Sequence, residues 1–214
     1  MLSESELLLL TKSTKELKPA GAVYVDTELL PSLFTTVIDF QMRTRVVEKA
    51  QTYFRAHLGG TVKNLGDLES LFEGRRNDRK ANTKIAEELW GYRLWVRAGL
   101  LRAMVSWMRQ EEIDDLEGLK DWAHRSEFKR DFEGRVRYHA EGRTYGLGLA
   151  VYNSLVMRLG VETVKPDTRL RNFVQSCLGR RVSDPELVAG LIEVASRNRT
   201  SPRLLDLAIW ESFD

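Results

Sequence analysis

The sequence predicts an all-α fold, and three observations support this class. Apolar residues recur at spacings of three and four along most of the chain, as they do on one face of an amphipathic helix. Pro185 and Pro202 follow helix-capping residues and stand in the first helical turn, where the missing N–H of proline costs nothing. Alternation typical of a strand is confined to one short segment, residues 22–26.

The apolar stripes place the helices in chain order. The first two stripes cover residues 33–38 and 46–54, and the polar residues 41–45 between them predict a tight connection. A long helix follows on the stripe at residues 94–108. The last third of the chain carries three further stripes, at residues 149–159, 170–178 and 187–195.

Composition and charge exclude several classes of protein. The 214 residues include 33 Lys and Arg against 31 Asp and Glu, and this net charge of +2 excludes a histone-like polycation. Hydrophobic residues at 43% are typical of a folded chain rather than a disordered one. Cys177 is the only cysteine, which excludes an internal disulfide, a cysteine-rich zinc site and a four-cysteine iron–sulfur cluster. The three histidines, His57, His124 and His139, lack metal-ligand spacing, so we expect no metal and no cofactor.

No targeting segment is expected. The longest apolar run near the N-terminus is residues 7–10, far below the ~20 residues of a membrane span. Glu4 and Glu6 precede this run, where a secretory signal carries positive charge. We therefore expect a protein without membrane contact that is cytoplasmic, associated with the nucleoid if its source is bacterial or archaeal, or located in the nucleus of a eukaryote. We also expect a monomer.

Basic residues concentrate in residues 143–181. Seven Lys and Arg stand there against two acidic residues, a net charge of +5, whereas residues 1–39 carry a net charge of −3. A local excess of this size can bind a phosphate backbone even in a nearly neutral protein. The alternative is a solvated helix surface.

Two glycines and one carboxylate carry the functional argument. Gly146 and Gly148 precede an apolar helix and permit a tight hairpin between two helices, whose amides can face a phosphate oxygen. Asp167 follows 19 residues after Gly148 at an expected helix start, with Arg169 and Arg171 beside it. A Gly-x-Gly before a helix is by itself more often an ordinary connection, and the combination with the carboxylate is more specific.

This arrangement resembles the helix-hairpin-helix (HhH-GPD) DNA glycosylase superfamily, the endonuclease III-like enzymes of base-excision repair. The family hairpin Leu-Pro-Gly-Val-Gly-Arg-Lys-Thr-Ala-Asn is similar to residues 144–153, Thr-Tyr-Gly-Leu-Gly-Leu-Ala-Val-Tyr-Asn. The family's aspartate segment, Val-Asp-Thr-His-Val-Arg-Arg, is similar to residues 166–172, Pro-Asp-Thr-Arg-Leu-Arg-Asn. Residues 38–50 look like the segment that opens the family's helical barrel, and residues 90–92 contain the Gly-Tyr that precedes its next long helix. The similar segments span residues 30–180 in the family's order.

The resemblance implies a helical fold in two lobes. A barrel lobe would span residues 33–140, and a second lobe would combine residues 1–32 with residues 141–214. The second lobe would carry the hairpin, about residues 141–160, and the aspartate segment, residues 164–173, at the cleft between the lobes. In the family this cleft holds a nucleotide that is flipped out of duplex DNA.

The activity that the resemblance implies is that of a monofunctional DNA glycosylase, which hydrolyses the N-glycosidic bond of a damaged or mispaired base in double-stranded DNA. The family lysine that forms a Schiff base with the sugar falls at Ala150, so a lyase reaction is not expected. The family's proline before the hairpin is Tyr145 here, and the single cysteine excludes the iron–sulfur branch. Two alternatives remain: a catalytically inactive helix-hairpin-helix DNA-binding protein, and a helical domain that binds other proteins.

The resemblance also assigns roles to single residues. Asp167 would be the catalytic carboxylate, and its ordinary role would be that of a helix N-cap. Gln41 would lie on the loop that fills the space of the extruded nucleotide, or else be an exposed amide. Arg169 and Arg171 would contact DNA phosphates, or else pair with neighbouring side chains. The complete set of expected DNA-binding residues is Gly146, Gly148, Arg143, Arg169, Arg171 and Gln41.

Four aromatic residues of the expected barrel have two possible roles. Most of them are expected in the core, and one or two are candidates for a base pocket, where an aromatic ring stacks on the extruded base. These residues are Trp90, Tyr92, Trp95 and Trp107.

Overall fold

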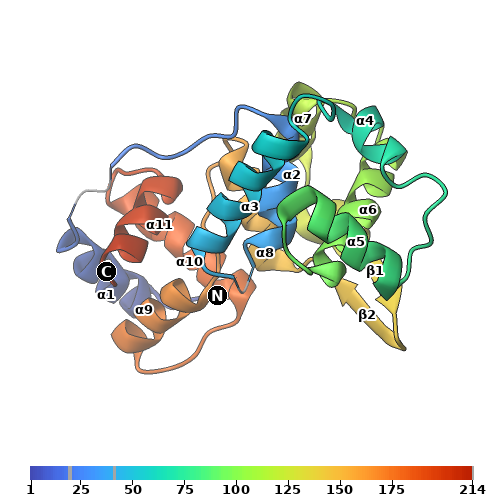
Figure 1. The fold of residues 1–214 in the computed structure, drawn as a ribbon. Coiled ribbons are helices and arrows are strands. Elements are labelled where there is room, and N and C mark those ends of the chain that lie inside the picture. Colours follow the sequence, from blue (N-terminus) through green and yellow to red (C-terminus); the bar gives the residue numbers. More distant parts are fainter. Residues whose placement is uncertain (19–20, 41, 214) are drawn as a thin grey trace. The chain divides into compact units, whose positions relative to one another are not determined.

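Helices make up most of the computed structural model, which describes residues 1–18, 21–40 and 42–213 (Figure 1). The chain divides into two compact units, which we call the terminal unit, Met1–Val25 with Leu149–Asp214, and the central unit, Asp26–Gly148. The predicted all-α class is confirmed, with one small β-hairpin in the central unit. Within the described ranges, every helix is too short or too polar to span a bilayer.

The central unit contains a run of helices followed by the hairpin. The apolar stripe at residues 94–108 is confirmed as helix α6, which packs against α2, α5 and β1. In chain order the elements are α2 (Leu29–Ile38), α3 (Thr44–His57), α4 (Leu65–Ser70), α5 (Arg79–Trp90), α6 (Trp95–Gln110), α7 (Leu116–Arg125), the π-helical turn η1 (Phe128–Phe132), β1 (Arg137–Ala140) and β2 (Arg143–Gly146).

Aromatic rings fill the core of the central unit. The ring of Phe34 meets the rings of Phe54 and Trp90 edge to face, at centroid distances of 4.7 and 5.8 Å. Trp107 meets Trp122 in the same way at 4.8 Å. Such pairs add to the free energy gained by burying the rings. Trp90 and Trp107 are therefore core residues, in agreement with the first of their two expected roles.

The terminal unit joins the two ends of the chain around one apolar cluster. Leu10 of α1 is fully buried in the same cluster as Leu191 of α10 and Ile209 of α11. The N-terminal helix therefore packs with the C-terminal helices, and α1 contacts both α9 and α10. The helices of this unit are α1 (Glu4–Lys15), α8 (Leu149–Arg158), α9 (Thr168–Leu178), α10 (Asp184–Arg197) and α11 (Pro202–Glu211).

Both helix starts that the prolines predict are confirmed. Ser201 is the N-cap of α11, and its side chain accepts a hydrogen bond of 3.2 Å from the Leu204 amide. Pro202 stands in the first turn. Ser183 is the N-cap residue of α10 by its extended backbone, without a side-chain hydrogen bond to the helix, and Pro185 stands in the first turn. Local sequence chemistry thus agrees with the observed boundaries of these two helices.

The segment before Gly148 is a β-hairpin, not the first helix of a helix-hairpin-helix motif. β1 and β2 pair antiparallel, with Tyr138 opposite Tyr145. Glu141 and Gly142 form the two-residue turn, and their φ angles of 50° and 70° are both positive. A type I′ turn requires positive φ at both central residues, and it matches the twist of the paired strands. The chain therefore reverses at Glu141–Gly142 rather than at the glycines that the sequence analysis selects.

Two further expectations, the place of the strand and the boundary between the two lobes, differ from the structure. The strand-like residues 22–26 form no strand, and the strands lie instead at residues 137–146. Of the segment expected in the second lobe, about residues 141–160, residues 141–148 belong to the central unit and the residues from Leu149 belong to the terminal unit. In the strands only Tyr138 is fully buried, so the apolar alternation that reveals a strand is almost absent.

Gly99 of α6 is the position that lets the hairpin pack on the helix. A Cβ atom at Gly99 would lie 2.4 Å from two ring carbons of Tyr138, well inside van der Waals contact. Because glycine has no such atom, the Tyr138 ring lies against the helix backbone and is 2% exposed. β1 consequently packs on α6, and β2 follows through its pairing with β1.

Gly99→Ala should destabilise the protein by about 1–3 kcal/mol, because the new methyl group displaces the Tyr138 ring from a filled site. The matched control is Gly118→Ala in α7, where a Cβ atom would have only ordinary contacts of 3.4 Å and more. This control should stabilise the protein by about 0.5–1 kcal/mol, as alanine does in a helix. Urea unfolding of both variants measures the difference, and equal stabilities would contradict the packing described here.

Candidate functional site

Asp167 is the N-cap of α9, with its carboxylate fixed at the start of the helix. Its Oδ1 atom accepts a hydrogen bond of 3.1 Å from the Leu170 amide, and its backbone is extended. Among the described residues, the second carboxylate oxygen accepts no hydrogen bond. The residue is half-buried, and the helix N-terminus favours its negative charge. The structure therefore presents one fixed carboxylate with an oxygen available to a ligand.

Two buried polar side chains hold the loop that leads to Asp167. Asn153 of α8 is 3% exposed, and its Nδ2 atom donates a hydrogen bond of 2.7 Å to the Val164 carbonyl. Asp206 of α11 is 9% exposed, and its Oδ1 atom accepts a hydrogen bond of 2.7 Å from the Lys165 amide. Buried backbone groups need such partners, so these contacts fix the path of the loop.

Asp206 has an unusual proton affinity. Burial raises the pKa of its carboxyl group to about 7, and the nearby charge of Asp167 acts in the same direction. The hydrogen bond from the Lys165 amide and the charge of Lys165 oppose this rise. Asp206 is thus a carboxyl group that changes its charge near neutral pH, next to a loop that ends in a second carboxylate. The sequence does not predict this role of Asp206, because nothing in the local pattern around it shows that it is buried.

Arg169 and Arg171 both have partners inside the terminal unit. Two nitrogens of the Arg171 guanidinium donate hydrogen bonds of 2.7 Å to the two carboxylate oxygens of Asp184, and this pairing raises the pKa of Arg171. Arg169 donates a hydrogen bond of 2.7 Å to the Trp210 carbonyl, and its guanidinium lies 3.9 Å from the centre of the Trp210 ring. These contacts correspond to the second of the two expected roles, although the partners stand on other helices.

The expected DNA-contacting residues of the hairpin are exposed. Arg143 opens β2 beside the turn, and among the described residues its side chain forms no ion pair. Gly146 and Gly148 do not adopt positive φ, so the backbone itself does not require glycine at either position. A Cβ atom at Gly148 would meet nothing within 4 Å. The backbone there is open to close approach from outside.

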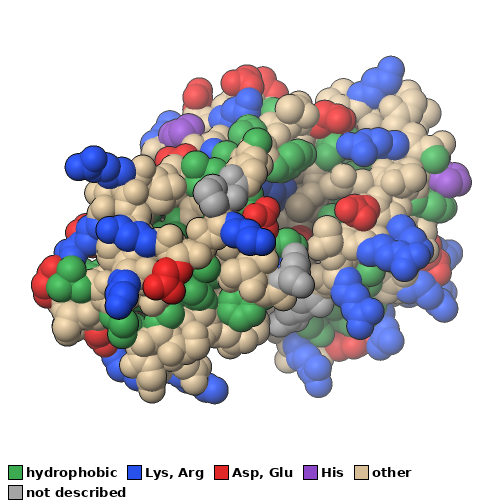
Figure 2. Space-filling view, turned by 90° about the vertical axis from the view of Figure 1, so that its left-hand side faces the viewer, with side chains coloured by type: hydrophobic (Ala, Val, Ile, Leu, Met, Phe, Trp, Pro, Cys, Tyr) green, Lys and Arg blue, Asp and Glu red, His purple; other side chains and the backbone are tan. Residues whose placement is uncertain are grey.

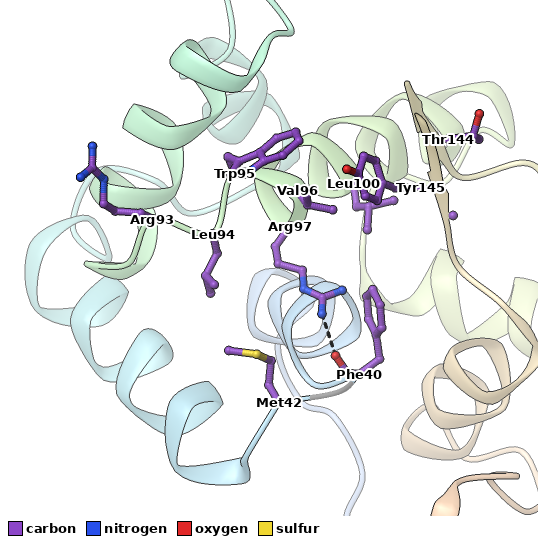
Figure 3. A pocket seen from close by; sticks show the side chains of 11 residues that line it. Phe40, Met42, Arg93, Leu94, Trp95, Val96, Arg97, Leu100, Thr144 and Tyr145 are labelled. Atoms are coloured by element: carbon purple, nitrogen blue, oxygen red, sulfur yellow. Dashed lines mark hydrogen bonds between the residues drawn. The ribbon is translucent and has the colours of Figure 1, made fainter. Parts of the chain in front are cut away.

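A pocket of about 540 Å³ lies within the central unit (Figure 3). Three half-buried aromatic rings line it, from Phe40 after α2, Trp95 at the start of α6 and Tyr145 in β2. The rings of Trp95 and Tyr145 meet edge to face with centroids 5.7 Å apart. The pairing of Tyr145 with Tyr138 in the hairpin sets this arrangement. Trp95 is the one of the four aromatic candidates that lines the pocket.

Arg97 brings hydrogen-bond donors to the pocket wall. Figure 3 shows its guanidinium against the Phe40 ring, 3.4 Å from the ring centre, with a hydrogen bond of 2.8 Å to the Phe40 carbonyl. Burial lowers the pKa of Arg97 to about 10, so the side chain keeps its positive charge at neutral pH. The sequence does not reveal the pocket role of Phe40, Arg97 and Tyr145, because no local pattern distinguishes these residues from core or surface residues.

The predicted site residues belong to different parts of the structure. The terminal unit contains Asp167, Arg169 and Arg171. The central unit contains the hairpin with Arg143 and Gly146, and Gly148 is the last residue of that unit. Gln41 lies outside the described residues. Its neighbours in the sequence, Phe40 and Met42, both line the pocket.

Charged side chains of both signs are spread over the face shown in Figure 2, in keeping with the net charge of +2. Many of these charges form pairs, such as Arg109 with Glu69 and Arg197 with Glu4. Within the described residues, no group of three or more His, Cys, Asp or Glu side chains is arranged to hold a metal ion.

One family model matches most of the chain. The model is described as Domain of unknown function (DUF8548), and it matches residues 32–213. The matched region includes the aromatic pocket, the hairpin and the loop that presents Asp167. No curated protein and no solved structure matches the chain.

The raised pKa of Asp206 predicts how stability depends on pH. The ordinary pKa of an aspartate in an unfolded chain is about 3.9, so between pH 4 and pH 7 the folded protein binds more protons at this site. The contribution of Asp206 is therefore present below pH 4 and is lost as the pH rises through 7. Asp206→Asn keeps an acceptor for the Lys165 amide and cannot ionise. As the pH rises from 4.5 to 8, the free energy of unfolding of the variant should increase by about 2–4 kcal/mol relative to that of wild type.

Urea unfolding at several pH values measures this difference. Asp115→Asn is the matched control, because Asp115 is an exposed N-cap of α7 that accepts a hydrogen bond of 2.8 Å from the Gly118 amide. The control should follow wild type across the range. Equal pH dependence in wild type and Asp206→Asn would show that the buried carboxyl group does not carry the effect.

Proposed function

We propose that this chain, which belongs to the DUF8548 family, is a monofunctional DNA glycosylase that releases a damaged or mispaired base from duplex DNA. The observation that carries the proposal is the fixed, half-buried carboxylate of Asp167 at the N-terminus of α9. The proposed fold is a two-lobed glycosylase fold in which a β-hairpin stands where the family has the first helix of its motif. The proposed partner is double-stranded DNA. We further propose that the protein acts as a monomer and uses no cofactor.

The chemistry of the reaction explains why one carboxylate would suffice. Cleavage of an N-glycosidic bond builds positive charge on the deoxyribose as the base departs. A fixed carboxylate beside the sugar stabilises this charge and can orient or deprotonate the attacking water. In Asp167, one oxygen is held by the Leu170 amide, and the other is available for the water or the sugar.

The aromatic pocket supports the proposal, because its lining suits a flat ring. Nucleobases that leave the helical stack are held between aromatic side chains and recognised by hydrogen bonds at their edges. Trp95, Tyr145 and Phe40 would provide the stacking surfaces, and the Arg97 guanidinium would provide donors. The volume of about 540 Å³ lies within the usual range of small-molecule sites.

The expected contacts with phosphate require a change from the sequence analysis. Since Arg169 and Arg171 have internal partners, we assign the phosphate contacts to Arg143 and to the open backbone around Gly148. A backbone amide without a side chain in front of it can approach a phosphate oxygen closely. These contacts position the duplex without reading its sequence.

Asp167→Asn should abolish base release and leave the fold intact, because asparagine caps a helix about as well as aspartate and carries no charge. The assay uses duplexes that each carry one lesion, an alkylated purine, an oxidised guanine or a deaminated base, and detects abasic sites by alkali cleavage. Before alkali is added, the product strands should stay intact, since Ala150 stands at the position of the family's lysine.

Asp115→Asn serves again as the control, since it makes the same substitution at another capped helix. It should release bases at the wild-type rate. If Asp167→Asn also did so, Asp167 would be a cap alone. If wild type bound duplex DNA and released no base from the panel, the catalytically inactive DNA-binding alternative would replace the proposal.

Arg143→Ala should weaken binding to all duplexes alike and lower the slope of log affinity against log salt concentration by about one, as the loss of one phosphate contact does. Arg171→Ala should leave affinity nearly unchanged, because Asp184 already neutralises its guanidinium. Fluorescence anisotropy at several salt concentrations measures both. Equal losses in the two variants would show that Arg171 exchanges Asp184 for phosphate.

A further inference from the structure

We infer that Asp206 is a positioning residue for Asp167, which holds the backbone before the catalytic carboxylate and adds a second negative charge near it. The inference rests on the proposed function, because it concerns the same site. Asp206 stands on α11, and Asp167 stands at the end of the loop before α9. The two residues are far apart in the sequence and are coupled through the backbone N–H and C=O of one residue, Lys165.

The geometry of this coupling is short and direct. The Lys165 amide donates its hydrogen bond of 2.7 Å to Oδ1 of Asp206. The Lys165 carbonyl accepts a hydrogen bond of 2.7 Å from the Asp167 amide. Lys165 is therefore held by Asp206 on one side and by Asp167 on the other, with the buried Pro166 between the two ends of the turn. A shift of the Asp206 carboxylate moves the backbone that presents Asp167.

The charged groups around Asp206 come from three elements. From the loop, Lys165 and Asp167 act on its charge in opposite directions. On α11 itself, Arg203 stands one turn earlier and has its own partners, Glu162 at 3.8 Å and the Tyr24 carbonyl at 2.8 Å. From α9, Arg169 lies on the ring of Trp210. Among the described residues no guanidinium forms an ion pair with Asp206, so its charge remains uncompensated by arginine.

The protonation state of Asp206 should therefore affect the reaction. A hydrogen bond to an ionised carboxylate is stronger than one to a neutral carboxyl group, so ionisation holds the loop more firmly. The added negative charge also stabilises the positive charge that develops on the sugar. The pKa of Asp206 is about 7, so base release should rise as the pH passes through that value.

The test measures single-turnover base release between pH 5.5 and pH 8.5, on the lesion that wild type cleaves best. Wild type should gain about tenfold in rate across this range. In Asp206→Asn the rise should vanish, and the rate should stay near the low-pH rate of wild type. A merely structural role predicts the opposite sign, because ionisation of buried Asp206 destabilises the fold and would lower activity at high pH.

Asn153→Ala is the matched control, because Asn153 holds the same loop at Val164 through a neutral amide. This variant should lower the rate at every pH and keep the rise near pH 7. Circular dichroism at each pH checks that all variants remain folded. A shared pH profile in wild type and Asp206→Asn would overturn the inference.

A second measurement does not depend on activity. Carboxyl-detected NMR follows the titration of Asp206 in wild type and in Asp167→Asn, and the pKa of Asp206 should fall in the variant because a neighbouring negative charge is removed. An unchanged titration would overturn the inference even if the enzyme were active. Failure of wild type to release any base would instead overturn the proposed function, and the titration would still decide whether the two carboxylates interact.

Discussion

The close approach of Tyr138 to Gly99 is the constraint on which the central unit depends. Because α6 has no side chain at that point, the Tyr138 ring is buried against the helix and β1 packs beside it. The register of the hairpin then places Tyr145 opposite Tyr138, with its ring 5.7 Å from that of Trp95. The pocket thus draws its walls from segments that are distant in sequence. The absence of a Cβ atom at Gly99 allows these segments to pack together.

In the terminal unit, the corresponding constraint is that buried backbone groups must be paired. The loop before α9 forms no strand ladder, so side chains must satisfy its amides and carbonyls. Asn153 does this with a neutral amide, which costs little to bury. Asp206 does it with a carboxyl group, and its raised pKa reflects the free energy cost of burying that charge. A neutral residue would hold the loop at a lower free energy cost, and buried carboxyl groups with a raised pKa are concentrated at functional sites of proteins.

The sequence predicts the features of this structure that depend on local chemistry. Amphipathic stripes predict the helices, because burial leaves a direct trace at spacings of three and four. The role of Asp167 as an N-cap follows equally from its place before an apolar stripe. The hairpin could not be predicted, because its turn begins with Glu141, a residue type uncommon at positive φ, and its support at Gly99 lies far away in the chain. The partners of Arg169 and Arg171 stand on other helices, and spacing shows only partners on the same helix.

These internal partners change how the arginines near Asp167 should act. An arginine directed at Asp167 would neutralise the negative charge that the proposed glycosidic cleavage requires of this carboxylate. Arg171 does interact electrostatically with Asp167, but its guanidinium forms both of its hydrogen bonds with Asp184, which offsets its charge. Asp206 adds a second carboxyl group that interacts electrostatically with Asp167. The proposed glycosylase reaction has two opposite electrostatic tasks, to stabilise a developing cation and to bind phosphate, and the pairing of Arg171 with Asp184 is why the proposal assigns them to different residues, Asp167 and Arg143.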